Sequence, residues 1–427
     1  MMDFRIITLP LAALLALAIY NWSLQPLNAY MGMVLIEVDL AWCGLFFVWI
    51  ALATTVLPRR VGRPSDLFLL FYVVICLPWG GALWGATGLL SVQAAVLMMV
   101  LLYLPALAIK VCIRIAGPSA RDFIIPVYLF RPSYLYLPLA GVLILGTVAA
   151  VSNLGHGSFG IDNVYDRRLA GREALSGSII ASYLIPMSIN GIAPLLAFMA
   201  GWRRSPLLLS VALAFAVLMF WLLGLKGPFV AIGALFGIGL VIGIPLLARA
   251  LVLIGIFCLL LILAVTAIQV SDGSYSTVAD YVIRRVVMVQ PEVQSYYLDH
   301  FLGLDLYQKL FGADLQGYAD WTFLIGDTYL HNPATNADTN GFFHALLRGG
   351  LVGYALSIAV VCAFLVVVDA LFEHTRMPEF IAVAGLYGLL VSEQSYTAAL
   401  LTSGIGLCLA LIILFSYPSP RNRTLPT

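Results

Sequence analysis

Charged residues are scarce in this chain. Asp, Glu, Lys and Arg make up 10% of its 427 residues, whereas 62% are hydrophobic, and the mean hydropathy is +1.01. A soluble globular domain has roughly 45–50% apolar residues, so the composition indicates a polytopic membrane protein with no hidden soluble domain. The 22 basic residues form no run or stripe, which argues against a nucleic-acid partner.

Several chemical signatures are also missing. The six cysteines include no C-x-x-C spacing and fall within or beside apolar segments, so neither disulfides nor zinc are expected. The chain has no Walker lysine loop, no H-E-x-x-H and no G-x-S-x-G elbow, which argues against ATP or zinc hydrolysis. Acids are rare within the apolar segments, whereas a proton-coupled pump needs several near the midplane. The acidic residues within or at the ends of the apolar segments are Glu37, Asp39, Asp369 and Glu393. We expect no cofactor and no metal.

Long apolar runs, in contrast, recur along the whole chain. Using about 20 residues per crossing, we predict about twelve spans in one all-α membrane domain, 1–427. The first lacks a small-residue cleavage site, so we expect it to be retained as a span. The predicted spans are 6–22, 36–57, 66–83, 89–109, 134–152, 178–201, 206–223, 228–247, 250–270, 350–372, 379–395 and 398–416.

The basic residues divide unequally between the two sides of these spans. With both termini in the cytoplasm, 14 of the 22 lie inside, as the positive-inside rule expects. Two long connections, 152–177 and 271–349, hold most of the others, and long loops commonly carry function. The eight bases predicted outside are Arg167, Arg168, Arg172, Lys226, Arg284, Arg285, Lys309 and Arg348.

The longer outer connection has the pattern of a partly folded segment. Apolar and aromatic residues recur at helical spacing before Gly312, and Pro291 predicts a break between two short helices. Its many aromatic residues suit a membrane interface, and they equally suit stacking on sugar rings. We expect Tyr165, Tyr297, Trp321, Asn336 and Asn340 to contact a glycan.

Three groups of outer cations are candidates for binding an anion. Arg167, Arg168 and Arg172 lie within six residues, and arginine grips phosphate bidentately; equally, they suit lipid headgroups or neighbouring carboxylates. Lys226, in the short turn "GLKGP", either reaches the interface or meets a lipid-linked phosphate. Arg284 and Arg285 are adjacent, so at most one of the two is expected to face a given ligand.

The stretch "NADTNGFFHALLRGG", Asn336 to Gly350, combines chemistry-bearing residues at the mouth of a predicted span. His344 and Arg348 are four apart and therefore share a helical face. Asp338 lies upstream, and Gly349 and Gly350 allow close approach of backbone or ligand. An imidazole beside a guanidinium is suited to orient a hydroxyl or a diphosphate oxygen, although an isolated interfacial histidine commonly has no such role.

Together these stretches resemble the Wzy-type polymerases of O-antigen and oligosaccharide repeat units. The resemblance lies in "YDRRLAGREALSG", "GLKGP", "RRV" and "NADTNGFFHALLRGGLVG", and its layout covers most of the chain. It implies a GT-C-like helical fold with a large, partly helical periplasmic loop between helices 9 and 10, in a bacterial inner membrane. The O-antigen ligases are similar, and the segment from His344 matches their pattern as well. Some of these polymerases have an R-x10-G loop motif. The spacing from Arg167 to Gly177 in this chain is one residue shorter than that motif.

The resemblance also implies a chemistry. A glycan would be transferred from undecaprenyl diphosphate to a sugar hydroxyl of a second lipid-linked unit, with no metal and no nucleotide. The implied partners are the lipid-linked oligosaccharides, the membrane lipid and a possible chain-length regulator. His344, and second Asp338, would serve as base or acceptor. The alternatives are a ligase that transfers glycan to a lipid core, a flippase, which the cation-poor spans disfavour, and a structural protein. The cations that would stabilise the leaving diphosphate are Arg167, Arg168, Arg172, Lys226, Arg284, Arg285 and Arg348.

Overall fold

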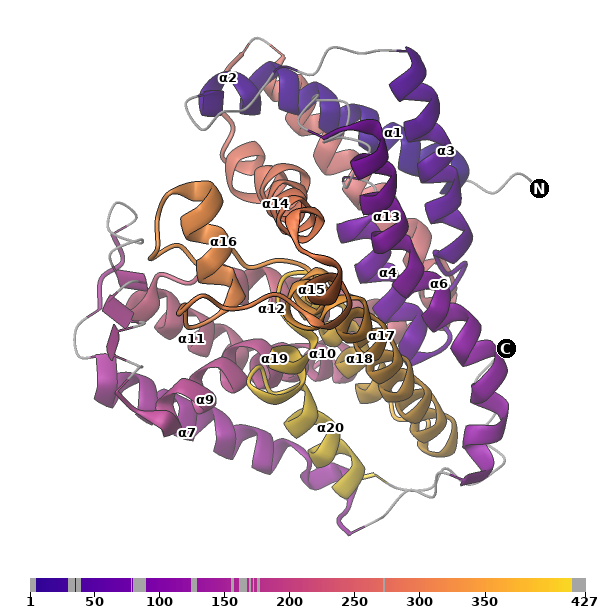
Figure 1. Cartoon of the computed structure of the whole chain (residues 1–427). Helices are drawn as coiled ribbons and strands as arrows, with labels where there is room; N and C mark the ends of the chain where they lie inside the picture. The colour runs from indigo at the N-terminus through magenta and orange to yellow at the C-terminus, as the bar shows by residue number, and fades with distance from the viewer. Residues whose placement is uncertain are drawn as a thin grey trace.

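The chain is a bundle of helices (Figure 1). This computed structural model describes residues 5–29, 35, 40–77, 79, 90–123, 129–154, 157–160, 167–168, 170–171, 173–174, 177–271 and 273–416, and contains no strand within those ranges. The principal helices are α1 (Arg5–Ile19), α2 (Gln25–Asn28), α3 (Leu40–Val56), α4 (Pro64–Cys76), α6 (Val92–Phe123), α7 (Tyr136–Leu154), α9 (Ile179–Met187), α10 (Ala193–Arg203), α11 (Pro206–Leu223), α12 (Gly227–Ile242), α13 (Pro245–Val270), α14 (Gln290–Gly303), α15 (Leu306–Phe311), α16 (Trp321–Leu330), α17 (Gly341–Thr375), α18 (Glu379–Val391), α19 (Tyr396–Leu401) and α20 (Ile405–Leu414). Short π-helical stretches are η1 (Tyr20–Leu24), η4 (Ser188–Ile192) and η5 (Ala279–Val289), and η3 (Pro132–Tyr134) is a 3-10 turn.

Eight helical stretches in the described part of the chain are long and apolar enough to cross a membrane, which supports the predicted multi-pass architecture. They are Ile7–Asn28, Val92–Gly117, Pro132–Leu154, Ile179–Arg203, Pro206–Leu223, Ala250–Val270, Gly341–Thr375 and Tyr396–Leu414. The other four predicted spans fall on α3, α4, α12 and α18, which have 17, 13, 16 and 13 residues. A helix of 13 residues is about 20 Å long, below the roughly 30 Å of hydrocarbon. The count of twelve therefore stays a prediction.

Small residues allow the closest helix pairs to form. A Cβ on Gly201 of α10 would lie 2.2 Å from the carbonyl oxygen of Phe236, and one on Gly239 of α12 would lie 2.3 Å from that of Phe198. Glycine at both positions lets the two backbones touch, which is how helices commonly associate in membranes. This contact also fixes direction, since α12 ends beside Trp202, next to Arg203.

Helices α4 and α17 run in opposite directions and define two ends of the bundle. At one end, Ser65 Oγ, early in α4, donates to Asp369 Oδ2 near the end of α17 (2.6 Å). At the other, Asn340 Nδ2, just before α17, donates to Cys76 Sγ at the end of α4 (3.2 Å). The Ser65 end carries bases that the positive-inside rule predicts to be cytoplasmic, so the Asn340 end is the predicted outer end.

Helix α17 begins nine residues before the predicted span and is kinked where that span was expected to start. Gly349 and Gly350 have non-helical φ/ψ of −133°/15° and 60°/−156°. The second pair is open only to glycine, and a Cβ on Gly350 would lie 2.4 Å from the carbonyl carbon of Leu310. The kink frees the Leu347 carbonyl, which accepts from Ala313 N (3.0 Å). The end of α15 is thereby docked on the kink.

Helices α14, α15 and α16 gather around the start of α17 and form a folded cap, residues 290–338 (Figure 1). The predicted partial folding of the long outer connection is therefore observed. The predicted break at Pro291 is not, because Val289 and Gln290 keep helical φ/ψ and the chain passes from η5 directly into α14. Pro291 lies at the point where the π-helical stretch passes into α14, inside this continuous helical segment.

Candidate functional site at the start of α17

His344 is buried in the first turn of α17 and contacts a carboxylate of the cap. Its Nε2 lies 3.2 Å from Asp320 Oδ1. The two side chains differ in accessibility: that of His344 is 7% exposed and that of Asp320 is 45% exposed. The pair therefore opens to solvent on the Asp320 side, so the carboxylate is the member that an incoming molecule reaches first.

Asp320 is held in place by the helix that it caps. Its carboxylate accepts from the backbone N of Thr322 (3.1 Å) as the N-cap of α16. Partial burial acts to raise the pKa of Asp320, but the hydrogen bonds from His344 and Thr322 and the His344 charge outweigh it and lower the pKa to about 2. Asp320 is therefore ionised over the whole physiological pH range and always available as an acceptor.

Tyr297 and Asp338 lie beside this pair. The hydroxyl of Tyr297 donates to the carbonyl of Ala337 (3.3 Å), and the residue is fully buried. Burial raises the pKa of Tyr297 well above its usual value, and the negative charges of Asp338 and Asp320 raise it further. Tyr297 therefore stays a neutral donor. It binds the segment that leads into α17 at Ala337, next to Asp338.

A second acid meets a predicted outer cation at the same end of the bundle. Glu393 follows α18, in a turn that packs on the start of α17: a Cβ on Gly341 would lie 2.7 Å from the carbonyl oxygen of Gln394. Glu393 is exposed, and its carboxylate lies within electrostatic range of Arg285. Arg285, itself exposed, therefore lies within electrostatic range of the turn that packs on the start of α17.

The structure also distinguishes Arg285 from its neighbour Arg284. The Nε of Arg284 lies 2.8 Å from Asp280 Oδ1 and also donates to the Asp280 backbone oxygen (3.1 Å). Its charge is thus balanced within η5. Sequence reasoning expected only one of the two to face a ligand, and the contacts favour Arg285.

Arg348 lies one turn after His344, on the segment of α17 before the kink. The two residues were predicted to share a helical face; they lie four apart on one helix, but His344 is buried and Arg348 is exposed. The backbone of Arg348 packs against Gly312, at which a Cβ would lie 2.2 Å from the Arg348 carbonyl oxygen. The start of α17 thus presents a guanidinium to solvent from a tightly fixed backbone.

The remaining predicted cations form a second group, at the end of α11 and the start of α12. Arg167 donates to the backbone oxygens of Ser158 and Gly160 and lies over the ring of Phe220, 5.8 Å from its centroid. Its guanidinium therefore holds the 157–160 segment against α11. Arg168 is adjacent in the same short helical stretch. Arg172 and Tyr165 lie outside the described residues.

Lys226 belongs to this second group by position. It precedes α12, and the Phe229 ring that follows it packs against the Phe220 ring (6.3 Å between centroids). Lys226 therefore lies near Arg167, at the end of α12 that points away from Arg203. Both are at the predicted outer end.

Three of the five side chains expected to contact a glycan are buried and have structural roles. Tyr297, Trp321 and Asn340 are 0%, 5% and 0% exposed. Asn340 caps α17 by accepting from Phe342 N (2.9 Å). Asn336 is half-buried and is therefore the accessible one of the four expected glycan contacts that the structure describes. Its Nδ2 donates to Asp338 Oδ2 (3.1 Å). These burial states leave no face of Tyr297 or Trp321 for stacking on a sugar.

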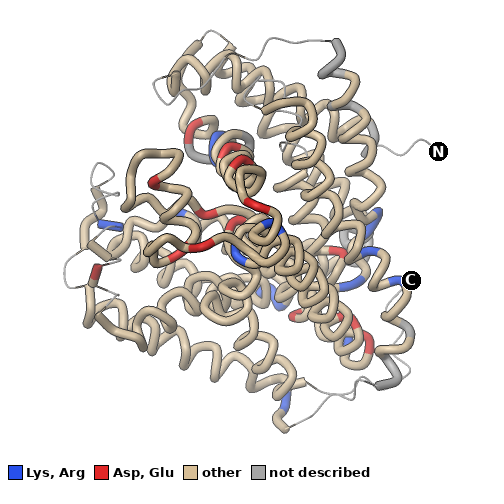
Figure 2. Tube along the Cα trace, in the orientation of Figure 1, with Lys and Arg blue, Asp and Glu red and all other residues tan. Residues whose placement is uncertain are grey.

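Other aromatic side chains of the cap are exposed instead. Tyr307 and Phe311 on α15 are 71% and 56% exposed, with ring centroids 5.1 Å apart. The remaining tyrosines mostly bind carboxylates of the cap itself: Tyr329 donates to Asp299 (2.7 Å) and Tyr296 to Glu292 (2.8 Å). Segment 271–349 has nine acids and four Lys or Arg residues, so it is acidic overall. Figure 2 shows acidic positions recurring along the cap.

Sequence reasoning missed Asp320 and the placement of Glu393. Asp320 begins "DWTF", and aspartate before a short apolar helix is an N-cap signal, but nothing local predicts its contact with His344. Among the described residues, no three His, Cys, Asp or Glu side chains group as a metal site. Comparison with protein-family models, with curated proteins and with solved structures finds no match to this chain.

Proposed function

We propose that the chain is a membrane glycosyltransferase that polymerises oligosaccharide repeat units linked to undecaprenyl diphosphate, at the outer face of a bacterial inner membrane. The observation that carries the proposal is the His344–Asp320 pair at the outer end of α17, half open to solvent. The resemblance to Wzy-type polymerases supplies the substrate class.

The reaction requires one new bond and one broken bond. A hydroxyl oxygen of the acceptor sugar attacks the anomeric carbon of the donor, the bond from that carbon to the diphosphate oxygen breaks, and the lipid diphosphate leaves with the electron pair. The hydroxyl proton passes to a protein acceptor or to water. The protein must therefore offer an acceptor to the nucleophile and cations to the leaving group.

Asp320 is the accessible acceptor in this scheme, and His344 positions it. The sequence favoured His344 as the base, but the imidazole is buried whereas the carboxylate is 45% exposed. A carboxylate that stays ionised at neutral pH accepts a hydrogen bond from the acceptor hydroxyl as that hydroxyl becomes acidic. His344, by donating Nε2–H to Asp320, sets the direction of the carboxylate oxygens.

Arg285 and Arg348 are the cations assigned to the diphosphate. Both are exposed at the same end of the bundle as the pair. Arginine forms bidentate hydrogen bonds to phosphate oxygens, and exposed guanidiniums are available for them. Arg284 and Arg167 are already engaged by Asp280 and by backbone oxygens. The exposed rings of Tyr307 and Phe311 are the platform assigned to the sugars, because sugar rings stack on aromatic faces.

The adjacent arginines of η5, Arg284 and Arg285, allow a controlled test of the proposed diphosphate binding. Arg285→Gln and Arg284→Gln would be expressed in a host that lacks its own polymerase and has a cognate repeat unit, and the length ladder of surface polysaccharide would be measured. We expect Arg285→Gln to shorten or abolish the ladder while single repeats remain attached to the lipid core. Arg284→Gln should leave most of the ladder in place.

Two outcomes would contradict the proposal. Loss of all surface glycan, with long chains accumulating on the carrier lipid, would indicate a ligase, the alternative that the sequence left open. A full ladder in Arg285→Gln and Arg348→Gln, at wild-type protein levels, would exclude the cation mechanism.

A further inference from the structure

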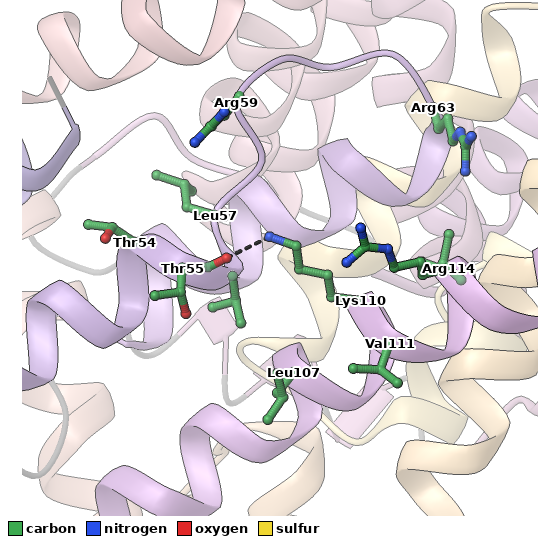
Figure 3. A pocket seen from close by; sticks show the side chains of 11 residues that line it. Thr54, Thr55, Leu57, Arg59, Arg63, Leu107, Lys110, Val111 and Arg114 are labelled. Carbon is green, nitrogen blue, oxygen red and sulfur yellow. Dashed lines mark hydrogen bonds between the residues drawn. The ribbon is translucent and has the colours of Figure 1, made fainter. Parts of the chain in front are cut away.

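A cavity of about 880 Å³ lies at the end of the bundle opposite the candidate site. It is formed by the end of α3, the 57–63 connection and the second half of α6 (Figure 3). This position is fixed by two contacts of the adjoining residues: Arg63 Nε lies 3.6 Å from Glu373 Oε1 near the end of α17, and Ser65 binds Asp369. From the kink to Thr375, α17 covers about 37 Å. The cavity and the candidate site are thus separated by roughly one bilayer core.

Four cations line this cavity. Arg59 and Arg63 come from the 57–63 connection, and Lys110 and Arg114, four residues apart on α6, come from the facing wall (Figure 3). None of the described residues that line it is Asp or Glu. Glu373 partly balances Arg63, but the four positive side chains around one cavity still repel one another, and an anion held between them relieves that repulsion.

Apart from Thr54 and Thr55, the rest of the lining is apolar, and part of it is exposed on the helix surface. Leu107 and Val111 are on the same stretch of α6 as Lys110 and Arg114, and they are 36% and 46% exposed. Leu57 adds to the apolar wall from the opposite side. A free phosphate ion would use the cations alone, whereas a lipid would use both the cations and this wall.

One polar contact shows how the cationic side is organised. The Nζ of Lys110 donates to the backbone oxygen of Thr55 at the end of α3 (2.5 Å). This bond holds the ammonium group at the rim of the cavity, so its charge is fixed there. Basic pockets between membrane helices on the cytoplasmic side are typical sites for anionic lipid headgroups.

We propose that this cavity binds an anionic glycerophospholipid of the cytoplasmic leaflet, with its phosphates between the 57–63 connection and α6 and its acyl chains against Leu107 and Val111. Four cations match a headgroup with two phosphates, so cardiolipin is the expected ligand. The site is independent of glycosyl transfer, because it lies at the other end of the bundle.

The test is lipid binding by the full chain. The purified protein would be delipidated in detergent and titrated with tetraoleoyl cardiolipin, dioleoyl phosphatidylcholine or inorganic pyrophosphate, and bound lipid would be counted by native mass spectrometry. Lys110→Gln/Arg114→Gln removes two charges from the cavity. Arg204→Gln/Arg376→Gln removes two exposed charges that do not line it, from the C-termini of α10 and α17.

We expect wild type and the Arg204/Arg376 control to retain cardiolipin, and the Lys110/Arg114 variant to bind it at least tenfold more weakly. Phosphatidylcholine should show no such difference. Val111→Trp, which adds bulk to the apolar wall and keeps every charge, should also weaken cardiolipin binding, so the result does not depend on one variant folding.

Equal weakening in both charge variants would overturn the proposal, because it would show a diffuse effect of net charge. Pyrophosphate that competes with cardiolipin at equal concentration, or unchanged binding in Val111→Trp, would show that the apolar wall has no part. Farnesyl diphosphate would be titrated in the same way, and tighter binding of it than of cardiolipin would overturn the identity of the ligand.

Discussion

The two ends of the α4 and α17 pair use their charges differently. At the start of α17, carboxylates of an acidic cap are held by tyrosines, by a histidine and by backbone donors, and Arg285 and Arg348 are exposed. At the other end, four cations line one cavity without an acid among its described lining residues. The first arrangement is suited to orient reacting groups, whereas the second is suited to hold an anion. A count of the bases on each side of the membrane does not reveal this difference between the two ends, because it ignores the acidic residues beside the bases.

The largest expected effect lies in the His344–Asp320 pair. Asp320→Asn should lower the transfer rate by about 10²-fold or more, because the accessible acceptor loses its charge. His344→Gln, which keeps a donor next to Asp320, should lower it by about tenfold. Rates would be measured as the release of undecaprenyl diphosphate from the lipid-linked substrate. Asp314→Asn, an exposed acid of the same cap, is the control and should have the wild-type rate. A larger loss in His344→Gln than in Asp320→Asn would make the histidine the base.

The next effect is on stability and tests the kink that brings the cap to α17. Gly350→Ala should lower the free energy of unfolding by about 2–3 kcal/mol, because alanine is strained at a φ of 60° and its Cβ meets the backbone of Leu310. Gly349→Ala is the matched control, since a Cβ there has no neighbour within 4 Å. Thermal unfolding in detergent would compare the two variants. Equal melting temperatures would show that the docking of α15 does not depend on this kink.

The sequence predicted the helices well because each apolar run is a local signal. It also marked "RGGLVG" as a place of close approach, and Gly350 provides it. The pair at the candidate site was beyond its reach, since Asp320 and His344 are 24 residues apart and meet only through the fold of the cap. Tyr297 and Trp321 were misassigned because aromatic residues in a polar loop have the same pattern whether they pack inward or face a ligand.

The effect of pH should be smaller. The pKa of Asp320 is lowered to about 2 in the folded protein, below about 3.9 in an unfolded chain. The ionised carboxylate therefore stabilises the fold above about pH 4, and this contribution is lost as pH falls toward 2. Melting temperatures from pH 6 to pH 3 should fall less steeply in Asp320→Asn than in wild type. Identical slopes would mean that the His344 contact adds nothing to stability.

The smallest effect is expected beside the basic cavity. Arg63 and Glu373 are 3.6 Å apart, with side chains 43% and 14% exposed. A double-mutant cycle of Arg63→Gln and Glu373→Gln should give a coupling free energy of about 0.2–1 kcal/mol, the range of solvent-exposed pairs. The coupling should weaken at high salt. A value above about 2 kcal/mol would show that Glu373 balances the cations, and that the cavity is less positive than its lining indicates.

The most direct test of the central claim is transfer by the purified chain in liposomes. The liposomes would contain lipid-linked single repeat units and no lipid core acceptor, and the products would be separated by length. We predict chains of two or more repeats on one carrier, with one undecaprenyl diphosphate released for each bond formed, and formation of these products that is about 10²-fold slower or more with Asp320→Asn. Single repeats that remain unjoined with folded wild-type protein, under conditions in which addition of a lipid core acceptor starts transfer, would contradict the account.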